Sequence, residues 1–251
     1  MDPTKLAVGA GATVLAVGGS YGIYSLAFSK EPKFIVSPTD GKFGWDFRHH
    51  FVDASDDENN VWWENAFKNR YPKTPTDQEL DTVFHNISSF SGLKSKCKEA
   101  YEKITKTEVS KDSGNEKYEK NVWELCSIDG VFPVAISVSN MPEDKAYKDE
   151  SNSTSKIAGA KKSKLISVKD PKNAKFWRRQ AEYFADKTNG LGKHASDSGA
   201  GFKAILDSND GLEAKLKNKC HENYAGDYNS SSMTAKTKET LRFCSLQGKP
   251  D

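Results

Sequence analysis

The chain carries one cysteine-containing segment twice. Residues 93–101 read LKSKCKEAY and residues 216–224 read LKNKCHENY, which are identical at six of nine positions with the cysteine in register. Downstream of each copy, the block Cys126–Gly130 is echoed by Cys244–Gly248. A repeat on this scale predicts two tandem copies of one folding unit, because each copy must bury its own apolar face.

The four cysteines occupy equivalent places in the two copies, as Cys97 and Cys126 in the first and Cys220 and Cys244 in the second. Apolar residues at helical spacing surround each of them, so each copy is expected to form a helix, a polar loop and a second helix. Four cysteines allow three pairings, and only Cys97–Cys126 with Cys220–Cys244 gives both units the same closed loop. Four buried free thiols or a metal site are the alternatives. Disulfides would indicate export from the reducing cytosol.

The N-terminal segment Leu6–Ser29 contains no charged residue over 24 positions. About 20 apolar residues in a helix cross the hydrocarbon core of a bilayer, so the segment is long enough to span it. We expect an uncleaved anchor; a signal peptide cleaved after Ser25-Leu26-Ala27 and a buried helix are the alternatives. Gly18 and Gly22 match the small-residue pattern through which membrane helices contact one another, which suggests self-association.

Two signals disagree on the orientation of this anchor. Lys30, Lys33, Lys42 and Arg48 follow the segment and Lys5 precedes it, which by the positive-inside rule places the large region in the cytoplasm. The cysteines favour the opposite side. We give the cysteines more weight, because long domains translocate largely regardless of charge. The expected location is a single-pass protein of the cell membrane with its soluble region extracellular.

The expected fold is mainly α: an N-terminal transmembrane helix followed by two tandem disulfide-linked helical units with a few short strands. Residues 1–30 form the anchor, 31–140 the first unit, 141–163 a polar linker rich in Lys, Ser, Asp and Glu, and 164–251 the second unit. Helices are expected at 61–70, 76–85 and 174–186, the first and last carrying the related segments Val61–Trp63 and Lys175–Trp177; short strands are expected at 131–138, 33–37 and 164–168.

The charge of the chain is nearly balanced, with a net value of +2, which argues against nucleic acid as a partner. Residues 30–150 hold 17 basic and 23 acidic side chains, and residues 151–251 hold 19 and 11. Opposite net charges of −6 and +8 are first of all what two ordinary solvated surfaces can carry. They would also favour docking of the two halves on each other, or of the basic half on an anionic surface.

No phosphate-binding loop, zinc-protease motif or nucleophile elbow is present, so neither a catalytic site nor a cofactor is predicted. The local cluster of ligand-type residues is His49-His50, between Asp46 and Asp53. Adjacent histidines on a regular element point apart, which makes this pair a poor site for one metal ion.

The layout of the chain resembles the uncharacterised paralogous membrane-anchored proteins of haemotropic mycoplasmas. The opening Met1–Gly9 with its Gly/Ala-rich apolar run, the pair Trp62-Trp63, and the block Val122–Ser127 echoed at Leu241–Ser245 carry this resemblance. It implies membership of a large duplicated set with no assigned activity, and therefore display at the surface.

These features together predict a surface-displayed protein that binds an unknown extracellular protein or surface ligand, or that serves in adhesion or antigenic display. A self-associating structural membrane protein is the main alternative. An unrecognised extracellular hydrolase is the third interpretation.

Overall fold

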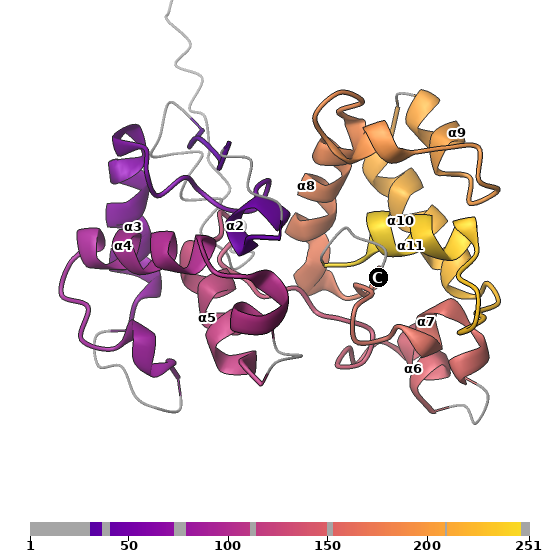
Figure 1. Cartoon of the computed structure of the whole chain (residues 1–251), viewed down its shortest axis with the longest axis horizontal. Coiled ribbons are helices and arrows are strands. Elements are labelled where there is room, and N and C mark those ends of the chain that lie inside the picture. Colours follow the sequence, from indigo (N-terminus) through magenta and orange to yellow (C-terminus); the bar gives the residue numbers. More distant parts are fainter. Residues whose placement is uncertain are drawn as a thin grey trace, which may run out of the picture.

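The protein forms two helical units that lie side by side (Figure 1). A computed structural model describes residues 31–36, 41–72, 79–110, 114–149, 153–208 and 210–246. Within these ranges the extended segments pair only at isolated positions, without forming a sheet. The mainly α prediction is therefore confirmed, while the predicted strands are reduced to single bridges.

The first unit is built around three helices, α3, α4 and α5, which contact one another. Its core consists mostly of aromatic and aliphatic side chains, among them the fully buried Trp63 and Trp123. Its elements are α2 (Phe43–Asp46), η1 (Asp57–Asn59), α3 (Asn60–Arg70), η2 (Thr82–Phe84), α4 (Phe90–Tyr101), η3 (Thr105–Val109) and α5 (Glu116–Cys126). The helix predicted at 76–85 is replaced, within the described residues, by η2, whose first turn is capped by the Asp81 carboxylate.

The second unit repeats this arrangement with α8, α10 and α11 in place of α3, α4 and α5. Its own core surrounds the fully buried Trp177. Its elements are α6 (Pro142–Asp149), η5 (Ser153–Ser155), α7 (Ile157–Ala160), η6 (Pro171–Asn173), α8 (Ala174–Ala185), η7 (Leu191–His194), α9 (Phe202–Asp207), α10 (Leu212–Tyr224) and α11 (Ala235–Cys244).

The isolated bridges recur in the same order in both units, which establishes the register of the duplication. The bridges of the first unit are Phe34↔Val52, Lys42↔Ile104 and Phe51↔Ser127, and those of the second are Ala135↔Ile166, Lys156↔Asp227 and Leu165↔Ser245. Between the two units the residue number rises by 101 from 34, by 114 from 42, 51 and 52, by 123 from 104, and by 118 from 127. Differences in chain length therefore fall between a few fixed anchor points.

Each unit is closed by one disulfide between its two last helices, as predicted. Cys97 bonds Cys126 and Cys220 bonds Cys244, and the Cα–Cα distance is 5.7 Å in both. This distance lies within the usual range for an unforced disulfide. The four cysteines are fully buried because helical spacing places each on the apolar face of its helix.

A buried tyrosine one turn after the first cysteine joins the extended segment of each unit to its last helix. The hydroxyl of Tyr101 donates toward the carbonyls of Val52, at 3.1 Å, and Cys126, at 3.2 Å. The hydroxyl of Tyr224 reaches the equivalent carbonyls of Ile166, at 2.7 Å, and Cys244, at 3.3 Å. Since burial disfavours the charged form, the pKa of both hydroxyls is raised well above 10 and they remain donors.

Replacing this hydroxyl should weaken either unit by a similar amount. We expect Tyr224→Phe and Tyr101→Phe each to lower the free energy of unfolding by about 1–2 kcal/mol, because buried carbonyls lose their donor. Urea unfolding measures the effect. Tyr228→Phe, whose ring is partly exposed, serves as the control and should change stability by less than about 0.5 kcal/mol; equal losses in all three variants would contradict this role.

A buried asparagine performs a second repeated task. Asn59 donates from its side chain to the carbonyls of Lys33 and Asp53 and accepts from the Lys33 amide. Asn173 makes the same three bonds with Val134 and Ser167. Helix α3 thus begins next to an asparagine that fixes two extended segments, and its side chain does not cap the helix.

The prediction of a linker over 141–163 is wrong in this structure. This range holds α6, η5 and α7, and Ile157 and Ala158 belong to the second core. Within α6, the carboxylate of Asp144 is buried and accepts a hydrogen bond from Ser167 at 2.5 Å. The polar composition of the range hid these few buried contacts, and the second unit begins near Val134, not at residue 164.

The predicted membrane anchor lies outside the described residues, as do Gly18 and Gly22. In the part of the chain that is described, no helix has both the length and the apolar character needed to cross a bilayer. The anchor therefore stays a prediction.

Candidate functional site

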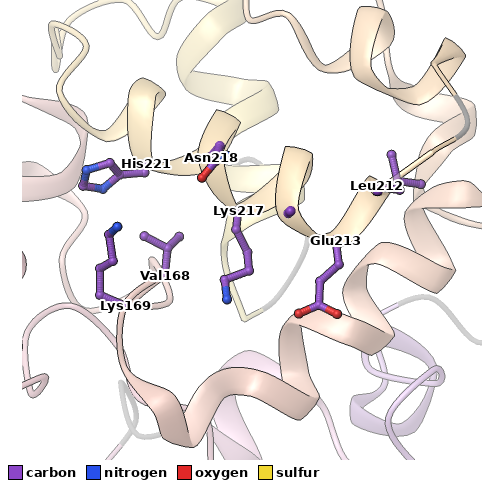
Figure 2. A pocket seen from close by; sticks show the side chains of 9 residues that line it. Val168, Lys169, Leu212, Glu213, Lys217, Asn218 and His221 are labelled. Atoms are coloured by element: carbon purple, nitrogen blue, oxygen red, sulfur yellow. The ribbon is translucent and has the colours of Figure 1, made fainter.

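A groove of about 730 Å³ lies in the second unit between α10 and the extended segment that precedes η6 (Figure 2). Most of its lining comes from successive turns on one side of α10. The lining residues are Val168, Lys169, Gly211, Leu212, Glu213, Ala214, Lys217, Asn218 and His221.

The position of the groove follows from how α10 packs. Leu216, Cys220 and Tyr224 are fully buried and hold one face of the helix against the core. Glu213, Lys217 and His221 are spaced four residues apart and form a neighbouring row on the same helix. Residues at this spacing share one face of a helix, so the three polar side chains point together into the groove.

The groove lining holds two lysines, Lys169 and Lys217, against one carboxylate, Glu213. Lys169 extends toward His221 at one end of the groove, Lys217 points into the hollow, and Glu213 lies toward the other end (Figure 2). Among the described residues, Lys217 and Lys169 form no side-chain hydrogen bond or ion pair, and Glu213 and Lys217 do not pair although their spacing would allow it. The groove thus offers cations with unused hydrogen-bonding capacity.

The first unit uses the equivalent lysine differently. Lys94 occupies the position of Lys217, and its ammonium donates to Asp57, at 2.8 Å, to Asn60, at 2.8 Å, and to the Asp56 carbonyl, at 3.3 Å. The Lys94 side chain is only 12% exposed, and its hydrogen bond and its charge lower the pKa of the Asp57 carboxyl. Lys94 therefore serves as a structural link between α4 and the start of α3.

Two of the three residues that bind Lys94 are replaced in the second unit. With a shift of 114 positions, Asp57 and Asn60 correspond to Pro171 and Ala174, neither of which has a side-chain acceptor. The Lys217 ammonium consequently has no such link. Two copies of one unit have diverged at this point, one toward a closed contact and the other toward an open cationic groove.

The two histidines considered as metal ligands lie elsewhere, between the units, where His50 is buried and His49 is partly buried. The ring of His49 stacks on Tyr183 of α8 with centroids 4.1 Å apart, and the ring of His50 stacks on Phe176 at 5.1 Å. Nε2 of His49 lies 3.0 Å from the Gln180 side-chain oxygen. Within the described residues no group of three His, Cys, Asp or Glu side chains could hold a metal ion.

The environment of this pair opposes protonation. Burial lowers the pKa of His49 to about 3, and burial together with His49 and Arg179 lowers the pKa of His50 well below 6.5. The nearby cation Arg179 contacts Asp129 at 3.2 Å, and both side chains are buried. The contacts between the two units thus include the stacked rings of His49 on Tyr183 and of His50 on Phe176, and the buried ion pair of Arg179 with Asp129.

Comparison with known proteins gave no match. No protein family, no curated protein and no solved structure is detectably similar to the chain.

Sequence reasoning located the cysteines but missed the groove. The useful signal was present: extending the Val61–Trp63 and Lys175–Trp177 alignment a few residues upstream pairs Asp57 with Pro171 and Asn60 with Ala174. The two replacements indicate a functional difference only because Lys94 binds Asp57 and Asn60 in the first unit.

Proposed function

We propose that this protein is a single-pass membrane protein that displays its two disulfide-linked units outside the cytosol and binds a ligand in the groove of the second unit. The main support for this proposal is Lys217, which lines the groove without a side-chain partner, whereas its counterpart Lys94 in the first unit is hydrogen-bonded to Asp57. The first unit then serves as scaffold and spacer.

The location rests on two independent features. Both disulfides join buried cysteines within one unit, and such bonds persist in oxidising compartments. The uncharged segment Leu6–Ser29 supplies the membrane anchor. Display at the surface also agrees with the resemblance to the paralogous proteins of haemotropic mycoplasmas, and contact between anchors through Gly18 and Gly22 would add avidity.

Native mass spectrometry of the protein extracted from its own membrane tests the binding function. We expect an adduct of a small molecule that is absent from two groove variants. Ala214→Trp should block the groove with a bulky side chain, and Pro171→Asp/Ala174→Asn should restore the partners that Lys94 has in the first unit and so withdraw the Lys217 ammonium.

The matched control is Ala235→Trp at an exposed position on α11, which should keep the adduct. An adduct retained by both groove variants would refute binding in the groove. Protease added to intact cells should cleave the displayed region; full protection, with digestion only after lysis, would contradict the location.

A further inference from the structure

The chemistry of the groove lining restricts the class of ligand. Lys169 and His221 lie together at one end, and Lys217 points into the space beside them (Figure 2). Cationic and ring N–H donors that lack protein partners favour a carboxylate, sulfate or phosphate group, with which they form charge-assisted hydrogen bonds. This end of the groove therefore accepts an anionic group.

The opposite end has the opposite preference. Glu213 lies on the same row one helical turn before Lys217, at the start of α10. Its carboxylate would repel a ligand that is negative along its whole length, and it accepts hydrogen bonds from hydroxyl groups. Asn218 adds an amide that both donates and accepts. The ligand should therefore carry one acidic group and, away from it, hydroxyl groups.

The remaining lining and the size of the groove narrow the class further. Val168, Leu212 and Ala214 supply aliphatic surface, and none of the nine lining residues is Phe, Tyr or Trp. Nucleobases bind mainly by stacking on aromatic rings, which this lining lacks. The volume of about 730 Å³ exceeds the need of a bare ion and falls within the range of small-ligand sites.

From these features we propose that the groove binds an acidic sugar: a pyranose of one or two rings with its carboxylate, sulfate or phosphate at Lys169, Lys217 and His221 and its hydroxyl groups toward Glu213. The aliphatic side chains cover the C–H face of the ring. This assignment rests on the proposed function of the groove and adds the class of ligand to it.

The test is a titration of the full-length protein in detergent, followed through the imidazole resonances of isotope-labelled histidine. His221 lines the groove and reports binding locally; its signal is assigned as the one missing from His221→Gln. The probes are glucuronate, glucose 6-phosphate, glucose and inorganic phosphate. We expect glucuronate and glucose 6-phosphate to shift the His221 signal at concentrations at least about tenfold lower than glucose or inorganic phosphate.

Removing one cation should identify the anionic end. Lys217→Gln should weaken binding of both acidic sugars by about tenfold, while Lys238→Gln, the same change at an exposed position of α11, should leave it unchanged. Glu213→Gln should reduce the difference in affinity between glucose 6-phosphate and inorganic phosphate, because it removes the carboxylate that faces the hydroxyl groups of the sugar.

Three outcomes would overturn the assignment. Equal binding of inorganic phosphate and glucose 6-phosphate would reduce the site to a simple anion site, and equal binding of glucose and glucuronate would remove the role of charge. If none of the probes shifts His221, acidic sugars are excluded. In that case an adduct that is present in native protein and lost in Ala214→Trp would still support the groove as the binding site of a different class of ligand.

Discussion

The variant Cys220→Ala/Cys244→Ala should lose about 3.5 kcal/mol of the free energy of unfolding. The bond closes a loop with a sequence separation of 24 residues, and cross-linking a loop of that length removes about this much from the entropy of the unfolded chain. Denaturant unfolding under non-reducing conditions measures the loss. Alanine is preferred to serine because both positions are fully buried.

The first unit supplies the matched comparison. Its bond spans 29 residues, so Cys97→Ala/Cys126→Ala should cost nearly the same amount. Removing the disulfide of the second unit should release the bound ligand at a lower denaturant concentration than in the unmodified protein, whereas removing the disulfide of the first unit should not. A loss below about 1 kcal/mol in either variant, or free thiols in protein alkylated directly in its own membrane, would contradict a structural role for these bonds and weaken the case for export.

Acid should destabilise the protein before its carboxylates begin to titrate. The pKa of His49 is lowered to about 3 in the folded protein, from 6.5 when the ring is in water, so the unfolded chain binds more protons between these values. Stability is then complete above pH 6.5 and falls as the pH drops toward 3. His49 alone should cost on the order of 2 kcal/mol at pH 5, and His50 acts in the same direction.

Urea unfolding at pH 7, 6 and 5 checks this dependence. His50→Phe should reduce the change in the free energy of unfolding with pH, because phenylalanine can stack on Phe176 and Trp123 without titrating. His221→Gln removes a histidine outside the interface and should keep the full change. Identical unfolding midpoints at pH 7 and pH 5 would show that the pair is not buried between the units in solution.

The duplication and the disulfide pairing could be predicted because both depend on local patterns. A cysteine on the apolar row of a helix is visible in LKSKCKEAY and LKNKCHENY alike, and the two copies left one symmetrical pairing. The helices at Asn60–Arg70 and Ala174–Ala185 were predicted for the same reason.

The features that failed to appear in the sequence depend on residues far apart in the chain. The side chain of Asn59 binds Lys33, 26 positions away. Residues 141–163 were expected to be a linker because their composition is polar. Their burial depends on distant residues: the carboxylate of Asp144 is buried against Ser167, 23 positions away. In the sequence, His49 and His50 resembled a poor metal site. Their role as stacking partners depends on Tyr183 and Phe176 of the other unit.

The equivalent bridges of the two units also separate what must stay fixed from what can change. Between the bridges at Phe34 and Lys42 the first unit has 13 fewer residues than the second has between Ala135 and Lys156, where α6 is accommodated. The same scaffold thus carries the helix α6 in this connection of the second unit, while both neighbouring bridges are present in both units. A chain built in this way can differ in length and sequence on its exterior while its tyrosine, asparagine and cysteine contacts remain the same.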